Sequence, residues 1–195
     1  MKKTNVIIVH GAYGHPEENW FGWLKRELNK MDVECLVPQL PTPHGQTMDA
    51  WTEAFFQSVD QKINQQTILI GHSLGAAFIL RWLEQCQYRV AKTILVGAFL
   101  GKVNQPKFDL INESFFQTSF NWENIKAKCK EFICYHGMND VYVSRQQFDF
   151  IADSLQAKKI IVSGAGHFNA ASGYVTFPHI LELLSCFTAM PVVTR

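Results

Sequence analysis

The segment Gly71-His72-Ser73-Leu74-Gly75 has the pattern Gly-x-Ser-x-Gly, which can hold a serine as a nucleophile. A short apolar run precedes it and a run with helical periodicity follows it, so we predict a strand, a sharp turn and a helix. Such a turn leaves almost no room for side chains at the flanking positions, and glycine meets that demand. The serine hydroxyl would then stand above the edge of a sheet, within reach of a substrate.

A serine hydroxyl is a weak nucleophile until a base takes its proton, so the hypothesis requires a histidine and an acid that orients it. In folds that carry this turn, the order along the chain is serine, then acid, then histidine. Asp140 comes shortly after the apolar run 131–135, and His167 comes shortly after the apolar run 159–162. We therefore predict that Ser73, Asp140 and His167 form a catalytic triad.

Other acids and histidines compete less well for these roles. Asp109 and Glu113, which lie between two predicted strands, stay open as alternative acids. The other histidines outside the serine turn either precede Ser73 or lack a glycine-flanked turn after a strand; they are His10, His15, His44, His136 and His179.

Attack on a carbonyl creates an oxyanion, which needs backbone amides as hydrogen-bond donors. One donor is expected from the residue after the nucleophile, Leu74, and the other from the loop after the first strand. In that loop we predict Ala12, because Gly11 lets the chain turn sharply, with the Tyr13 amide as the alternative. The sequence contains no nucleotide-binding loop and no spacing typical of a metal site, so we expect neither a cofactor nor a metal.

Short β-rich apolar runs alternate with amphipathic ones, which predicts parallel strands joined by crossover helices. We expect strands over residues 5–9, 33–37, 67–70, 93–98, 131–135 and 159–162. Apolar stripes with helical spacing lie within 20–31, 51–63, 77–86, 148–155 and 180–187. The predicted fold class is α/β, with a doubly wound sheet of about six parallel strands and helices on both faces. This fold would bring the predicted triad to the carboxyl edge of the sheet.

Residues 99–122 interrupt this alternation. The segment is turn-rich and weakly periodic, and it carries six aromatic residues: Phe99, Phe108, Phe115, Phe116, Phe120 and Trp122. An irregular aromatic segment at a sheet edge can form a cap over a pocket or an extra packing layer. The residues that we expect to bind substrate are Tyr13, His72, Phe99 and Phe168.

The chain has 195 residues, enough for one core, and no repeat or linker divides it, so we predict one domain over residues 1–195. It is 47% hydrophobic and only 18% charged, with a net charge of +1, which excludes a disordered chain and an electrostatically driven nucleic-acid binder. No apolar stretch approaches the roughly 20 residues that span a membrane. Five scattered cysteines favour free thiols, and no signal peptide is evident, so we expect a cytoplasmic protein.

Several segments carry a resemblance when they are taken together: His10-Gly11, 19–24, 71–75, 121–126, Asp140 with Tyr142-Val143, and 166–168. They are similar to the small α/β-hydrolases of the retinoblastoma-binding-protein-9 type, and the likeness runs from about Val6 to Phe187. It implies an α/β-hydrolase core with a minimal cap, the same triad and no cofactor. Members of that family are described as serine hydrolases with esterase or amidase-type activity.

Two positions depart from the family pattern. The retinoblastoma-protein partner of the vertebrate member is attributed to a Leu-x-Cys-x-Glu motif, and the nearest match, residues 184–188, ends in threonine. We therefore expect no such partner. The usual Asp-x-x-Val-Pro reads Asp140-Val141-Tyr142-Val143-Ser144, without the proline.

The sequence predicts a serine hydrolase that cleaves small or medium acyl esters through an acyl-enzyme on Ser73. Only about 30 residues separate the predicted fourth and fifth strands, too few for a large lid. An amidase or aminopeptidase acting on short substrates stays open as an alternative. So does a non-catalytic protein-binding module, because a fold does not guarantee chemistry.

Overall fold

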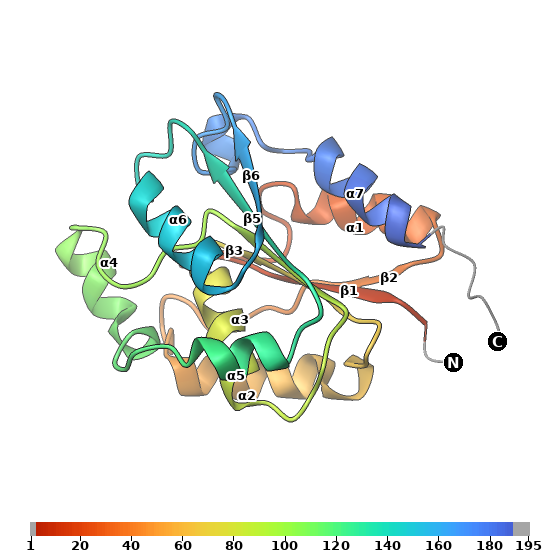
Figure 1. Ribbon diagram of the computed structural model, residues 1–195, viewed down its shortest axis with the longest axis horizontal. Helices are drawn as coiled ribbons and strands as arrows, with labels where there is room; N and C mark the ends of the chain where they lie inside the picture. The colour runs from red at the N-terminus through yellow and green to blue at the C-terminus, as the bar shows by residue number, and fades with distance from the viewer. Residues whose placement is uncertain (1–2, 189–195) are drawn as a thin grey trace.

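The computed structural model describes residues 3–188, which contain one six-stranded sheet in the order β2-β1-β3-β4-β5-β6 with every neighbouring pair parallel (Figure 1). The strands are β1 (Asn5–Val9), β2 (Glu34–Leu36), β3 (Ile68–His72), β4 (Lys92–Val96), β5 (Phe132–Gly137) and β6 (Lys158–Val162). All six predicted strands are confirmed, with ends that differ by no more than two residues. The termini of the predicted domain, residues 1–2 and 189–195, lie outside the described residues.

Helices cover both faces of the sheet, as the alternation of patterns predicts (Figure 1). On one face lie α1 (Phe21–Lys30) and α7 (Pro178–Thr188). On the other lie α2 (Met48–Val59), α3 (Leu74–Gln85), α5 (Trp122–Ala127) and α6 (Arg145–Ser154). The expected fold class, a parallel α/β sheet with helices on both faces, is confirmed.

The core has two halves, one on each face of the sheet, because successive strand residues point to opposite faces. Ile7, Leu69 and Leu95 pack under α2, α3, α5 and α6, whereas Ile8 and Ile70 pack under α1 and α7. Strands β1, β3, β4 and β5 are buried along their whole length, which explains their nearly continuous apolar sequences. Edge strand β6 contains no fully buried residue.

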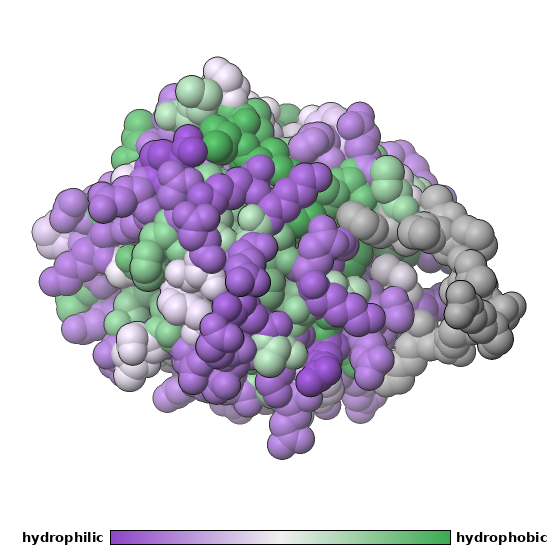
Figure 2. Space-filling view, in the orientation of Figure 1, coloured by the Kyte–Doolittle hydropathy of each residue, from purple (hydrophilic) through white to green (hydrophobic). Residues whose placement is uncertain are grey.

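One face of the molecule is mostly polar (Figure 2), although 47% of the residues are hydrophobic. Figure 2 shows hydrophilic side chains over most of one face, with a hydrophobic cluster near the top, in the region of the β5–β6 edge. Within the described part of the chain, no helix is long and apolar enough to span a bilayer.

The aromatic segment 99–122 contains more regular structure than predicted: α4 (Pro106–Ile111), a 3-10 helix (Glu113–Phe115) and the start of α5. Each of these elements has six residues or fewer, too short to show a helical period in sequence. Arg81 of α3 anchors the segment. Its buried guanidinium donates to the backbone carbonyls of Phe115, Thr118 and Ser119, pairs with Glu84 and stacks over Phe120.

Replacing Arg81 with methionine is expected to lower the free energy of unfolding by about 3 kcal/mol, because three carbonyls and the Glu84 carboxylate lose their donor. Urea unfolding followed by circular dichroism measures this change. The exposed Arg89 provides the matched control, and Arg89→Met should change the stability by no more than about 0.5 kcal/mol. Equal midpoints for the two variants would contradict the anchoring role.

Candidate active site

The predicted functional residues gather at the carboxyl edge of the sheet. Ser73 directly follows β3, Asp140 lies three residues after β5, and His167 lies five residues after β6. The loop that starts at His10 follows β1 at the same edge. Because β1, β3, β5 and β6 belong to one parallel sheet, their carboxyl ends meet at one side, where α/β folds place their sites.

The turn at Ser73 has a strained backbone that the surrounding structure holds in place. Ser73 has φ 55° and ψ −121°, a backbone conformation that residues other than glycine rarely adopt. Its amide donates to the Val96 carbonyl at 2.9 Å. A Cβ atom at residue 71 would lie 2.6 Å from the Ala76 Cα, and one at residue 75 would lie 2.3 Å from the Val9 oxygen. The two flanking glycines are therefore required by close backbone approaches, as the sequence pattern predicts.

The three side chains predicted as a triad form a continuous chain of hydrogen bonds. The Ser73 Oγ lies 2.9 Å from His167 Nε2, and His167 Nδ1 lies 2.8 Å from the Asp140 Oδ2. The Asp140 side chain is fully buried and that of His167 is 8% exposed. Because a carboxylate only accepts, His167 Nδ1–H donates to Asp140, which leaves Nε2 as the ring nitrogen that can accept the serine proton.

Asp140 stays ionised despite its burial. Burial raises its pKa, but the hydrogen bond from His167 and those from the Tyr142 and Val143 amides, at 2.9 and 3.1 Å, outweigh burial and lower the pKa overall. The alternative acid Asp109 instead accepts from the amides of Val103 and Gln105 and closes a turn before α4. Of the three acids considered, Asp140 is the one hydrogen-bonded to His167.

Two further residues contact His167, and the sequence analysis assigned neither of them a role at the site. Gly97, directly after β4, has φ +57°, and a Cβ atom there would lie 3.0 Å from the His167 Cε1. Only glycine lets the imidazole lie so close to this loop. The ring of Tyr142 lies 5.0 Å from the imidazole ring, edge to face, and both residues line the same pocket. Tyr142 belongs to a segment that carries the family resemblance, but neither residue has a sequence pattern that indicates this contact.

The amides predicted as oxyanion donors have no other acceptor. Within residues 3–188, neither the Ala12 amide nor the Leu74 amide donates a hydrogen bond to another protein group. Leu74 begins α3, so its amide is one of the unpaired donors of a helix N-terminus. The alternative donor, the Tyr13 amide, is occupied by the Thr42 Oγ1 at 2.9 Å and the Gln46 Oε1 at 3.2 Å.

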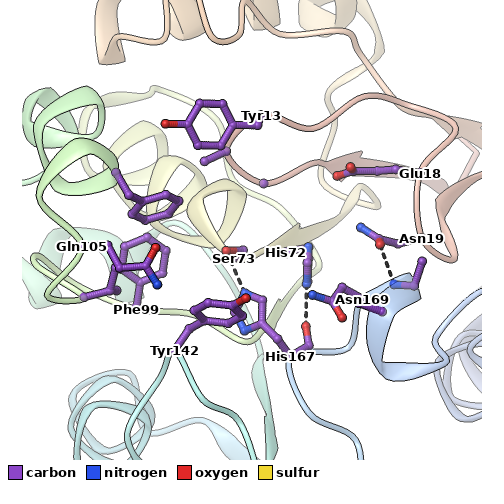
Figure 3. Close-up of a pocket in the computed structure, with 16 residues that line it drawn as sticks. Tyr13, Glu18, Asn19, His72, Ser73, Phe99, Gln105, Tyr142, His167 and Asn169 are labelled. Atoms are coloured by element: carbon purple, nitrogen blue, oxygen red, sulfur yellow. Dashed lines mark hydrogen bonds between the residues drawn. The ribbon is translucent and has the colours of Figure 1, made fainter.

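A pocket of about 430 Å³ opens over Ser73 (Figure 3). Three of the four residues predicted to contact substrate line it: Tyr13, His72 and Phe99. Nine further residues line the pocket, and the sequence did not predict any of them to bind substrate. They are Glu18, Asn19, Val103, Gln105, Phe108, Tyr142, Asn169, Ala170 and Ala171. Several of them come from the loops after β1 and β6, whose sequences show no periodicity.

The prediction that Phe168 contacts substrate is wrong. Phe168 is fully buried and stacks on Phe177 at 5.3 Å, on the α1 and α7 side of the sheet. The backbone turns sharply here, with positive φ at both Gly166 and Phe168, and this turn points the phenyl ring into the core. The Trp20 indole binds the Phe168 carbonyl at 3.1 Å and holds the turn in place.

His72 lies inside the serine turn as a neutral side chain. Its Nε2–H donates to the His167 carbonyl at 2.8 Å, so it also holds the loop that carries the proposed base. Burial and the neighbouring His167 lower its pKa to about 3, and the ring carries no charge at neutral pH. Its Nδ1 is buried, and no group in residues 3–188 donates to it.

Comparison with known proteins places the chain in a family. The profile of the serine hydrolase family matches residues 6–186. The chain belongs to the serine hydrolase family. This serine hydrolase is 29% identical to serine hydrolase RBBP9 of Rattus norvegicus over 171 residues, covering 85% of this chain and 87% of that protein. It is 27% identical over 184 residues to the putative hydrolase YdeN of Bacillus subtilis, covering 93% of this chain and 95% of that one.

Solved structures agree with this placement. The ydeN gene product from B. subtilis superimposes on this serine hydrolase with a TM-score of 0.85 and 26% sequence identity, covering 96% of this chain and all of that one. The meta-cleavage product hydrolase from Pseudomonas fluorescens superimposes with a TM-score of 0.68 at 13% identity, over 95% of this chain and 90% of that one. The second likeness concerns the fold alone. The expected α/β-hydrolase fold and the resemblance to the retinoblastoma-binding-protein-9 type are confirmed.

Proposed function

We propose that this serine hydrolase is a carboxylesterase that cleaves small or medium acyl esters with Ser73, His167 and Asp140 as its triad. The observation that carries the proposal is the unbroken chain of hydrogen bonds from Ser73 through His167 to Asp140 at the base of the pocket. A nucleophile, a base and a buried acid in this order are the parts that acyl transfer needs.

In the first step, the Ser73 Oγ forms a bond to the ester carbonyl carbon while His167 Nε2 takes the hydroxyl proton. The carbonyl electron pair moves to oxygen and creates the oxyanion. When the tetrahedral intermediate collapses, the bond from carbon to the leaving oxygen breaks, and His167 returns the proton to the alcohol that departs. Asp140 stabilises the imidazolium formed between these events and keeps Nδ1 protonated.

In the second step, water attacks the acyl carbon on Ser73 and gives its proton to His167 Nε2. Collapse breaks the bond between the acyl carbon and the Ser73 Oγ, which takes the proton back from His167. The carboxylic acid leaves and the starting state returns. Both oxyanions would accept hydrogen bonds from the amides of Ala12 and Leu74.

His10 orients the proposed Ala12 donor. Burial lowers the pKa of His10, so the ring is neutral; Nδ1 donates to the Gly11 oxygen at 2.8 Å and Nε2 accepts from the Leu40 amide at 3.0 Å. The Gly11 carbonyl and the Ala12 amide belong to one planar trans peptide, in which C=O and N–H point in opposite directions. By holding the carbonyl, His10 keeps the amide directed at the oxyanion.

His10→Leu is expected to lower kcat for a p-nitrophenyl ester by about 10- to 100-fold while KM changes less than about threefold, because an oxyanion donor acts in the transition state. Steady-state kinetics measure the two constants, and a thermal melt checks that the variant is folded. His10→Gln, whose side chain can both donate and accept, should recover part of the loss. A large rise in KM with unchanged kcat would contradict this positioning role.

The size of the pocket and the aromatic segment favour small or medium acyl groups. Phe99, Val103 and Phe108 of segment 99–122 line the cavity, and Tyr13 packs against Phe108 at 6.1 Å. We propose that this segment is a minimal cap within a single domain over residues 1–195. The five cysteines form no disulfide, which favours a reducing compartment such as the cytoplasm.

A fluorophosphonate, which reacts with activated serines, tests the proposal. We expect one adduct on the purified protein, mapped to Ser73 by peptide mass spectrometry, and turnover of p-nitrophenyl esters with an optimum among the shorter chains. An adduct on another residue or none at all would contradict the proposal, and the absence of any adduct would favour a binding module. Anilides cleaved as fast as the matching esters would make the protein an amidase.

A further inference from the structure

A network of hydrogen bonds joins three segments that are far apart in the sequence. Its members are Tyr13 of the loop after β1, Thr42 and Gln46 of the loop before α2, and Asn112 of segment 99–122. Of these four residues, Tyr13 is the one that lines the pocket over Ser73 (Figure 3). Gln46 is 2% exposed and Asn112 is 1% exposed. Polar side chains buried this deeply need protein partners, so the bonds between them are part of the fold.

Gln46 is the centre of this network, because both ends of its side-chain amide are used. Its Oε1 accepts from the Tyr13 amide at 3.2 Å and from the Thr42 hydroxyl. Its Nε2 donates to the Asn112 Oδ1 at 2.6 Å. One buried side chain therefore connects the loop that carries the proposed oxyanion donor Ala12 to the aromatic segment 99–122.

The Tyr13 backbone has a conformation that needs this support. Its φ of 59° is rare for a residue other than glycine, and such a conformation persists only where the surrounding structure holds it. Two acceptors hold the Tyr13 amide, the Thr42 Oγ1 at 2.9 Å and the Gln46 Oε1. The Tyr13 amide shares a rigid peptide plane with the Ala12 carbonyl, so these bonds fix the plane that follows Ala12.

Ala12 is thus held from both sides. His10 holds the peptide plane that precedes it, through the Gly11 oxygen at 2.8 Å, and Gln46 helps to hold the plane that follows it. Because the backbone has only two soft dihedral angles per residue, fixing both planes fixes the φ and ψ angles of Ala12. The direction of the Ala12 amide therefore depends on Gln46 as well as on His10.

Asn112 is placed for the bond that it accepts from Gln46. Its own Nδ2 is buried, and no group in residues 3–188 accepts from it. A buried donor without an acceptor is costly, so the gain from this asparagine lies in the Oδ1 that it offers to Gln46. A second bond joins the same two segments, because the Met48 amide at the start of α2 donates to the Ser114 Oγ at 3.0 Å.

We propose that Gln46 is a positioning residue that holds the Ala12 amide in place and makes its direction depend on segment 99–122. The inference rests on the proposed function, since it concerns an oxyanion donor of that reaction. Gln46 does not touch the substrate and acts through the Tyr13 peptide. A displacement of Asn112 would reach that peptide through Gln46, so the segment beside the pocket and the amide that stabilises the oxyanion would move together.

Two substitutions at opposite ends of the Gln46–Asn112 bond test the inference. Gln46→Met and Asn112→Leu should each lower kcat for p-nitrophenyl butyrate by about 10-fold while KM changes less than about threefold, because an oxyanion donor acts in the transition state. Asn112 is the more telling position, since it does not line the pocket and its side chain bonds to Gln46. The matched controls Gln57→Met and Asn124→Leu, at exposed positions of α2 and α5, should keep the wild-type constants.

A rescue and a double variant give readouts that a merely structural role would not produce. Burial favours the neutral form of a glutamic acid at position 46, which can accept and donate as glutamine does, so Gln46→Glu should recover most of the lost kcat. Combining Gln46→Met with Asn112→Leu should cost little more than the stronger single change, because both break the same connection. Fully additive losses would contradict the coupling, and thermal melts check that each variant is folded.

Hydrogen exchange separates this inference from the proposed chemistry, because it needs no turnover. Followed by NMR, the Tyr13 amide should exchange at least about 10-fold faster in Gln46→Met and in Asn112→Leu than in the wild type or the controls. If it does so but the wild type hydrolyses no ester, the proposed esterase function fails and the support of the Tyr13 peptide by Gln46 stands. If exchange in Asn112→Leu equals that in Asn124→Leu, or if kcat of an active enzyme is unchanged in Asn112→Leu, the inference is overturned.

Discussion

Ser73→Ala is expected to lower kcat for p-nitrophenyl butyrate by about 10⁵-fold or more and to abolish labelling by a fluorophosphonate. The methyl group of alanine cannot form the acyl-enzyme, while the pocket and the amides of Ala12 and Leu74 stay in place. The remaining rate would come from water attacking a bound ester beside these amides, so KM should change little. Stopped-assay kinetics at high protein concentration and in-gel fluorescence measure the two effects.

Ser163→Ala provides the matched control, since Ser163 follows β6, is exposed and does not line the pocket. It should keep both the labelling and the hydrolysis of the wild type. Undiminished hydrolysis in Ser73→Ala would show that another group attacks the ester. Hydrolysis lost in both variants would point to damaged folding, which matching circular dichroism spectra and melting temperatures exclude.

Asp140→Asn is expected to lower kcat by about 10⁴-fold with little change in stability. The asparagine amide would donate toward His167 Nδ1 and stabilise the tautomer that carries its proton on Nε2, so the ring could no longer accept the serine proton. The asparagine oxygen can still accept from the Tyr142 and Val143 amides, which keeps the loop in shape. Steady-state kinetics and a thermal melt distinguish loss of function from loss of fold.

Asp109→Asn separates the two acids that sequence alone leaves open. Asp109 accepts from the amides of Val103 and Gln105, whereas the carboxylate bonded to His167 is that of Asp140, so replacing Asp109 should reduce kcat no more than about threefold. A loss of several thousand-fold in Asp109→Asn, together with a mild effect of Asp140→Asn, would reverse the assignment.

The sequence indicated the fold and the proposed triad because both depend on order along the chain. Buried parallel strands require nearly continuous apolar runs, and these runs locate β1, β3, β4 and β5. Chain order and the strand ends then identify Ser73, Asp140 and His167, which the structure joins by hydrogen bonds although 94 residues separate the first from the last.

The lining of the pocket could not be predicted in the same way, because it depends on the direction in which loop side chains point. Phe168 adjoins His167 in sequence, yet the positive φ angles of its turn place its ring in the half of the core under α1 and α7, and it does not line the pocket. Glu18 and Tyr142 lie in loops without periodicity and reach the pocket only because the chain folds back over the sheet edge. Gly97 leaves room for the His167 imidazole, which is 70 residues away in sequence.

Because β6 is an exposed edge strand, we expect the part of the proposed active site that follows it to unfold more easily than the centre of the sheet. His167 follows the one long strand of the sheet that has no fully buried residue, whereas Ser73 follows a central strand that is buried throughout. Proteins open locally where few contacts hold an element, with a free energy below that of global unfolding. Fraying of β6 would separate His167, the proposed base, from Ser73, the proposed nucleophile, while the central strands stay paired. Heat inactivation would then begin as a local and reversible event, at temperatures where most of the sheet is still native.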